Sequence, residues 1–241
     1  MSGNKYRLDQ AMVKLDLAET RSQAENYIKL GEVEVDKKKI TKPGYFVSLD
    51  SKIKLLAHEH YVSRAALKLA SVASTFEIDL RAKNVLDVGS STGGFTDFAL
   101  QNGAKKVVAV DVGSAQMHPK LRQNSKIELH EQTDIREFET SEKVDIIVID
   151  VSFISLKEIM PSLKKFAKNA DVYAMLKPQF EAGNTKKHKG VVKNERMRRD
   201  ILKDFEQWVS KEWVIKQKSD SGVSGSKGNI ERFYHLKLAK A

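Results

Sequence analysis

The chain has 241 residues, of which 41% are hydrophobic and 31% charged, with four prolines and no cysteine. This composition is typical of a globular protein with a buried core, and it excludes disordered, collagen-like and disulfide-rich classes. The formal net charge of +10 favours a polyanionic partner. No apolar run reaches the roughly 18 residues of a membrane span, so a cytoplasmic location is expected.

Residues 1–60 are expected to form a small separate unit. Apolar residues recur at helical spacing over 7–15 and predict a short amphipathic helix. A second helix is expected over 23–30, ended by a glycine. Apolar and polar residues then alternate over 33–55, which predicts short strands. The unit would thus contain two helices followed by a short sheet.

Four stretches of this unit resemble the RNA-binding domain named after the fourth small-subunit ribosomal protein. They are Arg7-Leu8-Asp9, residues 20–24, residues 28–35 and Lys42-Pro43-Gly44. The resemblance implies RNA binding, with Arg7 and Arg21 as candidate contacts. The chain departs from the family at Asp36-Lys37, where Asn-Gly is usual. A protein–protein adaptor is the alternative, because the unit carries little net charge.

Residues 61–241 are expected to form a doubly wound α/β domain. Apolar strand patterns alternate with helical patterns, as in a mostly parallel sheet flanked by helices. A long helix over 194–211 and a terminal hairpin over 213–238 with an antiparallel edge follow. The predicted strands are 84–88, 106–112, 127–130, 144–149 and 172–176, and the earlier helices are 95–100 and 156–166.

A glycine-rich turn follows the first of these strands, where such folds bind nucleotides. Glycine lets the backbone approach a ligand closely, but the G-x-G-x-x-G pattern of dinucleotide sites is absent. A plain tight turn is the alternative. The candidate cofactor-binding residues here are Asp87, Gly89, Ser90, Ser91, Thr92, Gly93, Gly94 and Phe95.

Acidic residues follow the next two strands. Asp111 comes about twenty residues after the turn, where a carboxylate accepts hydrogen bonds from a ribose diol. Asp134 follows the third strand and is the candidate acceptor for an adenine amino group. These features favour a nucleoside cofactor, and the absence of cysteine and the scattered histidines favour no metal site.

Five stretches resemble, in order, the S-adenosylmethionine site and neighbouring motifs of FtsJ-like methyltransferases, in particular the TlyA branch historically labelled hemolysin A. They are residues 87–97, 110–113, 116–122, 150–156 and 176–181. The resemblance implies S-adenosylmethionine as cofactor and ribosomal RNA as partner. The chain departs from the family at Ala65-Ala66, where two glycines are usual.

The same resemblance places a catalytic set at Lys68, Asp150, Lys177 and Glu231. Two of these residues, Asp150 and Lys177, follow apolar strands directly, at the edge where such sheets keep their sites. A ribose 2′-hydroxyl is a poor nucleophile, so Lys177 would act either as the base or as the cation that stabilises the alkoxide. A structural ion-pair network is the alternative.

Other methyl acceptors fit the sequence less well. Carbon-5 methylation of pyrimidines usually needs a cysteine nucleophile, which the chain lacks. Methylation of base amino groups usually shows an Asp/Asn-Pro-Pro-aromatic motif, whereas this chain has Asp150-Val151-Ser152-Phe153. A ribose 2′-hydroxyl of ribosomal RNA is therefore the expected acceptor.

Residues 141–241 carry 21 lysines and arginines against 13 acids. Part of this excess falls in one short window, dense enough to contact several phosphates; a solvated loop and helix face is the alternative. The candidate RNA-binding residues of this window are Lys186, Lys187, Lys189, Arg196, Arg198 and Arg199.

Two further functions stay open at this point. A membrane-active hemolysin is suggested by the historical family label, although no membrane span or long basic amphipathic helix supports it. A catalytically silent RNA-binding or ribosome assembly factor would keep the fold without binding the cofactor.

Overall fold

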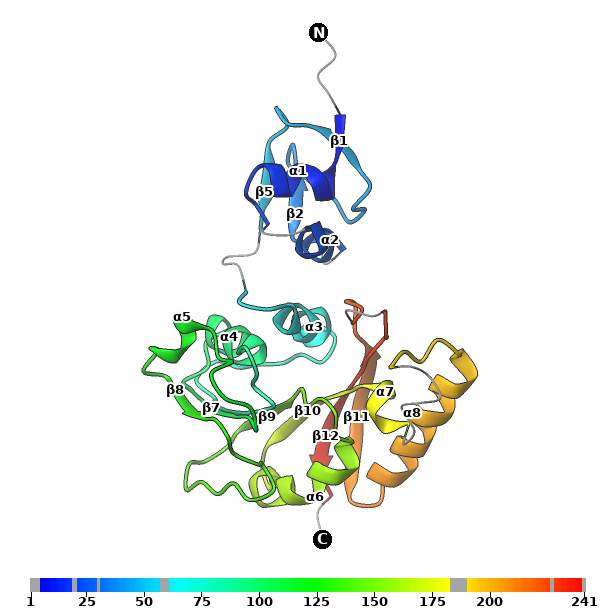
Figure 1. Ribbon diagram of the computed structural model, residues 1–241. Coiled ribbons are helices and arrows are strands. Elements are labelled where there is room, and N and C mark those ends of the chain that lie inside the picture. The colour runs from blue at the N-terminus through cyan, green and yellow to red at the C-terminus, as the bar shows by residue number, and fades with distance from the viewer. Residues whose placement is uncertain are drawn as a thin grey trace.

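The computed structural model describes residues 5–18, 21–29, 31–56, 61–182, 190–225 and 228–239. A small N-terminal unit stands beside a larger unit that is built around one sheet (Figure 1). Helix α3 (Arg64–Ala73) lies on the side of the larger unit that faces the N-terminal unit (Figure 1).

The N-terminal unit contains two helices and two small antiparallel sheets. β1 pairs with β4, and β2 pairs with both β3 and β5. The predicted helices and following strands are confirmed, but the strand before the first helix is too short for its sequence to signal it. The elements are β1 (Lys5–Arg7), α1 (Leu8–Lys14), α2 (Arg21–Lys29), β2 (Val33–Val35), β3 (Lys38–Lys39), β4 (Phe46–Ser48) and β5 (Ile53–Leu55).

The turn between β2 and β3 keeps its geometry without glycine. Asp36 and Lys37 have φ values of +49° and +67°, and both central residues of a type I′ hairpin turn need positive φ. Asp36 is held by Lys52, whose backbone N–H donates to its Oδ1 at 2.9 Å. The departure from Asn-Gly therefore leaves the hairpin in place.

The larger unit contains a seven-stranded sheet in the order β11-β12-β10-β9-β6-β7-β8. β12 (Arg232–Leu238) is antiparallel to β10, and β11 (Trp213–Asp220) forms the edge beside it. The doubly wound, mostly parallel sheet and its terminal antiparallel hairpin are thus confirmed. The parallel strands are β6 (Asn84–Val88), β7 (Lys106–Val110), β8 (Ile127–His130), β9 (Ile146–Ile149) and β10 (Asp171–Leu176).

Helices cover both faces of this sheet. Neighbouring strand residues enter different buried clusters: Val85 packs in the cluster of α3 and α4, and Leu86 in that of α6 and α8. This division follows because successive strand side chains point to opposite faces. The helices are α4 (Gly94–Gln101), α6 (Leu156–Ala167) and α8 (Glu195–Val209), with short α5 (Pro119–Arg122) and α7 (Pro178–Glu181).

The strand order reverses beside β6. The chain runs outward from β6 to β7 and β8, then crosses back to β9 on the other side of β6. Loops that leave neighbouring strands in opposite directions open a crevice at their carboxyl ends, where open α/β sheets bind ligands.

Candidate active site

A cavity of about 590 Å³ lies at the carboxyl ends of β6, β7, β8 and β9. Its position is the switch point of the sheet, and its volume is in the usual range for a small-ligand site. Four of the predicted cofactor residues line it: Gly89, Ser91, Asp111 and Asp134. Lining residues outside the predicted set include Val112, Gln116, Thr133, Ile135, Arg136 and Phe153, which also follow strand ends.

Gly89 lines this cavity and packs against the backbone that follows β9. Its φ is +81°, and a Cβ atom at this position would lie 2.7 Å from the carbonyl oxygen of Asp150. A side chain here would clash with the end of β9, so the position requires glycine. Glycine therefore lets the turn after β6 pack against the loop after β9, and Gly89 itself lines the cavity.

The Asp111 carboxylate is fixed by two backbone donors. Ser91 N–H donates to its Oδ2 at 2.8 Å, and Gly113 N–H donates to its Oδ1 at 2.7 Å. A carboxylate has about four acceptor sites, so these two bonds leave capacity for a ligand hydroxyl. The geometry suits the ribose contact that the sequence predicts.

Asp134 has a different environment although it lines the same cavity. Arg136 donates from Nε to Asp134 Oδ1 at 3.0 Å and from Nη2 to Oδ2 at 2.6 Å. These side-chain hydrogen bonds lower the pKa of Asp134. A contact to an adenine amino group would therefore share this carboxylate with Arg136.

The other predicted cofactor residues are not among those that line the cavity. Asp87 is fully buried, accepts a hydrogen bond from Thr96 Oγ1 at 2.6 Å, and has its pKa raised to about 7 by burial. Gly93 precedes α4 with a φ of +91°, and Phe95 packs against Phe233. Of the others, Ser90 and Gly94 are buried and Thr92 is exposed.

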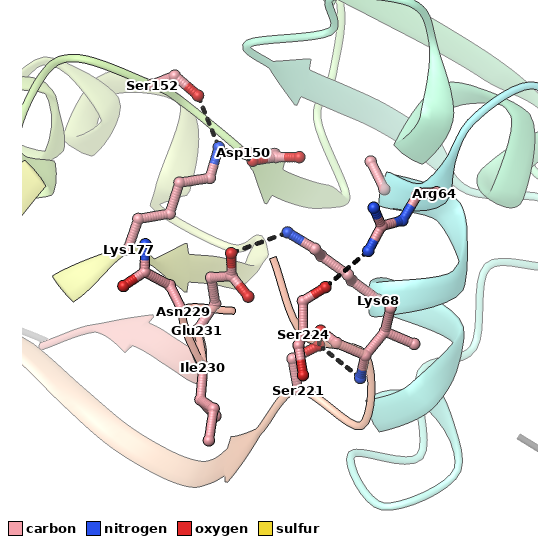
Figure 2. Close-up of polar contacts among 12 residues, drawn as sticks. Arg64, Lys68, Asp150, Ser152, Lys177, Ser221, Ser224, Asn229, Ile230 and Glu231 are labelled. Carbon is pink, nitrogen blue, oxygen red and sulfur yellow. Dashed lines mark hydrogen bonds and ion pairs between the residues drawn. The ribbon is translucent and has the colours of Figure 1, made fainter. Parts of the chain in front are cut away.

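The four predicted catalytic residues form two ion pairs (Figure 2). Lys177 Nζ lies 2.5 Å from Asp150 Oδ1 and donates to Ser152 Oγ at 2.7 Å. Lys68 Nζ lies 2.9 Å from Glu231 Oε1. All four charged side chains are at least five-sixths buried, and a charge in such a place needs a partner.

A second cavity, of about 420 Å³, contains both lysines. Lys68, Lys177 and Glu231 line it, whereas Asp150 lines the larger cavity. Ser152 and Phe153 line both cavities, so the two meet at the loop after β9. The Asp150–Lys177 pair thus borders both cavities, whereas the Lys68–Glu231 pair lines only the smaller one.

The larger cavity fits a nucleoside cofactor. It offers a fixed carboxylate with spare acceptor capacity at Asp111, an open backbone at Gly89, and apolar side chains at Val112 and Ile135. Sites for such ligands combine a mostly apolar lining with a few placed polar groups.

The predicted RNA-binding arginines differ in exposure. Arg7 and Arg21 both bind the buried Asp9, at 2.9 and 2.8 Å, and remain partly exposed. Arg196 and Arg199 are exposed on α8, whereas Arg198 is buried and pairs with Asp220. The remaining predicted contacts, Lys186, Lys187 and Lys189, lie outside the described residues.

Two family models match the chain. One, described as FtsJ-like methyltransferase, matches residues 61–238, and the other, described as S4 domain, matches residues 7–53. A 23S rRNA (cytidine-2′-O)-methyltransferase TlyA of Campylobacter jejuni is 44% identical over 75% of this chain and 72% of its own. A 16S/23S rRNA (cytidine-2′-O)-methyltransferase TlyA of Mycobacterium tuberculosis is 34% identical over 96% of this chain and 89% of its own.

A solved structure is similar as well. A Streptococcus thermophilus protein named as a hemolysin is 36% identical, with a TM-score of 0.69, over 98% of this chain and 90% of its own. Within the described residues, no helix combines the length and the apolar character that a membrane span requires.

Proposed function

The chain belongs to the FtsJ-like methyltransferase family and carries an S4 domain, and from this premise we propose that it methylates a ribose 2′-hydroxyl of ribosomal RNA. S-adenosylmethionine is the proposed methyl donor. The observation that carries the proposal is the Asp150–Lys177 contact between the two cavities, with the Lys68–Glu231 contact in the smaller one. Two relatives are rRNA cytidine-2′-O-methyltransferases, which supports the same acceptor.

The larger cavity is the proposed donor site. Bound S-adenosylmethionine supplies an electrophilic methyl group on a positively charged sulfur. Asp111, held by the N–H groups of Ser91 and Gly113, accepts hydrogen bonds from the donor ribose. The backbone at Gly89 passes close to the ligand, and Asp134 with Arg136 borders the base. These groups orient the donor, and orientation supplies a large part of the acceleration.

The smaller cavity is the proposed acceptor site. As the 2′-oxygen bonds to the methyl carbon, the bond from that carbon to the donor sulfur breaks, the sulfur keeps the electron pair and leaves as a neutral thioether, and the 2′-oxygen must lose its proton. Lys177, oriented by Asp150 and Ser152, either takes that proton as the neutral amine, or as the ammonium stabilises the oxygen while its proton leaves to water. Lys68 and Glu231 also line this cavity and complete the set of charges around the ribose.

RNA is held outside the cavities in this proposal. Residues 1–60 form the RNA-binding domain, with Arg7 and Arg21 as phosphate contacts, and residues 61–241 form the methyltransferase domain. Exposed Arg196 and Arg199 are the proposed phosphate contacts of the larger unit, and Lys186, Lys187 and Lys189 are proposed from the sequence alone. A ribosomal substrate supports a cytoplasmic location for the proposed activity.

The test is transfer of labelled methyl from S-adenosylmethionine to purified ribosomal subunits and to free rRNA, with nuclease digestion to locate the label. Lys177→Ala is the active-site variant, and Lys105→Ala, an exposed lysine before the amino end of β7, is the matched control. We expect label on a ribose 2′-oxygen with wild type and Lys105→Ala but not with Lys177→Ala. RNA binding without cofactor binding would instead favour a catalytically silent factor.

A further inference from the structure

The hydrophobic core of the N-terminal unit extends into the catalytic part of the molecule. Leu67 of α3 and Val223 of the loop between β11 and β12 belong to the same buried cluster as Met12 and Tyr27. Their exposed fractions are only 2% and 1%. Two segments of the larger unit, far apart in sequence, are thus anchored in the core of the smaller one.

Polar contacts fix the same loop to α3. Arg64 Nη2 donates to the Ser224 carbonyl oxygen at 2.9 Å (Figure 2). Gly222 N–H donates to Ser71 Oγ at 3.0 Å, and this hydroxyl donates to the Lys68 carbonyl oxygen at 2.6 Å. The loop and the helix therefore share a hydrogen-bonded junction as well as a hydrophobic one.

The Lys68–Glu231 ion pair lies at this junction. Lys68 follows Leu67 directly on α3, and Ser221 N–H donates to the Glu231 carbonyl oxygen at 2.9 Å. A Cβ atom at Gly225 would lie 2.5 Å from Glu231 Oε1, so the loop backbone passes against this carboxylate. The loop that carries Val223 thus defines where the Glu231 side chain sits.

We propose that Val223 is a positioning residue, through which the N-terminal unit holds the Lys68–Glu231 pair in its working geometry. The inference rests on the proposed methyltransferase function. It gives the N-terminal unit a second role beside RNA binding, because its core supports one wall of the acceptor cavity. Displacement of a catalytic group by about 1 Å is enough to cost about 100-fold in rate.

The test compares Val223→Ala with Val47→Ala. Val47 lies on β4 in the same buried cluster, so both variants lose the same two methyl groups from the same core. We expect Val223→Ala to lower kcat by about tenfold or more, with KM for rRNA and Kd for S-adenosylmethionine nearly unchanged. Val47→Ala should keep kcat, and Val223→Ile should restore it. Equal kcat in the two alanine variants, or a change confined to KM, would overturn the proposal.

Amide hydrogen exchange provides a readout that needs no methylation. We expect Val223→Ala to speed exchange at Gly222, whose N–H binds Ser71, and at Ser221, whose N–H binds Glu231. Val47→Ala should leave both amides protected. If the wild-type protein methylates no rRNA, the proposed function is wrong. Unchanged exchange at these two amides in Val223→Ala would refute the positioning role, whether or not the protein methylates rRNA.

Discussion

Lys177 and Asp150 are brought together by the register of two parallel strands, with Nζ 2.5 Å from Oδ1. Ala174 of β10 lies opposite Ile149 of β9. Asp150 directly follows β9, and Lys177 directly follows β10, three residues after Ala174. The sheet itself therefore sets this contact, and a rigid sheet edge is a suitable place for a group that must meet a reacting atom.

Two substitutions distinguish whether Lys177 acts as the base or as the cation that stabilises the alkoxide. Lys177→Ala should lower kcat by about 100-fold or more, since general acid–base or electrostatic contributions are of this size. Lys177→Arg keeps a positive charge that does not lose its proton. If Lys177 is the base, the arginine variant should be as slow as the alanine variant. If it stabilises the alkoxide, arginine should retain part of the rate in single-turnover methyl transfer.

The second ion pair gives a prediction on stability. Glu231 is only 2% exposed and binds Lys68. Lys68→Met leaves this carboxylate buried without its partner and should lower the free energy of unfolding by about 3 kcal/mol. Lys68→Met combined with Glu231→Gln should regain most of that loss. Denaturant unfolding of the two variants measures the difference, and equal losses in both would contradict the buried pair.

Central parallel strands of the sheet, such as β7 and β9, could be predicted because their sequences are almost continuously apolar. The run Ile146–Ile149 is apolar on both faces, as a central parallel strand must be. Charged residues that directly follow such strands share one edge of the sheet. Asp111, Asp150 and Lys177 could therefore be placed at this edge from their positions, whereas the catalytic role predicted for Asp150 and Lys177 came from the family resemblance.

Other features could not be predicted from local pattern. Lys68 and Glu231 are 163 residues apart, and only the tertiary fold brings α3 against the end of the hairpin. Arg198 belongs to a basic window in sequence, but on α8 it shares the buried stripe of Leu202 and Phe205. Arg198, Leu202 and Phe205 have the i, i+4, i+7 spacing of one helix face, which indicates burial of Arg198. A count of charges does not take this spacing into account.

Cofactor affinity should depend on Asp111. Asp111→Asn replaces one acceptor oxygen by an NH₂ group, which faces the backbone donor of either Ser91 or Gly113. The ligand hydroxyls also lose a charged acceptor; one charge-assisted hydrogen bond to the ligand is worth about 2 kcal/mol, so Kd for S-adenosylmethionine should rise by at least about tenfold. Titration calorimetry measures this Kd. Asp79→Asn, at an exposed residue before the amino end of β6, is the control and should leave Kd unchanged.

RNA affinity should respond differently to the arginines of α8. Arg196 and Arg199 are exposed, so their combined replacement by alanine should reduce the salt slope of rRNA binding by about two. Arg198→Ala removes the buried partner of Asp220 and should lower stability with little effect on that slope. Filter binding between low and high salt gives the slopes. If the salt slope fell only in Arg198→Ala, Arg198 would be the phosphate contact and Arg196 and Arg199 would not.

Asp87 gives a pH dependence to folding. Burial raises its pKa from 3.8 to about 7, although Thr96 Oγ1 donates to Oδ2 at 2.6 Å. A carboxyl group whose pKa is higher in the folded than in the unfolded state binds its proton preferentially when folded. Its contribution to stability is therefore complete below about pH 4 and is lost as the pH rises through about 7.

Asp87→Asn removes this titration while an amide oxygen remains to accept from Thr96. Between pH 4 and 8 the free energy of unfolding of wild type should fall, relative to the asparagine variant, by on the order of a few kcal/mol, since each unit of pKa shift corresponds to about 1.4 kcal/mol. Denaturant unfolding at several pH values measures this difference. Other carboxylates titrate equally in both proteins, so they cancel in the comparison. If the free energy of unfolding changed with pH equally in the two proteins, the pKa of Asp87 would not be raised by folding. This result would contradict the prediction.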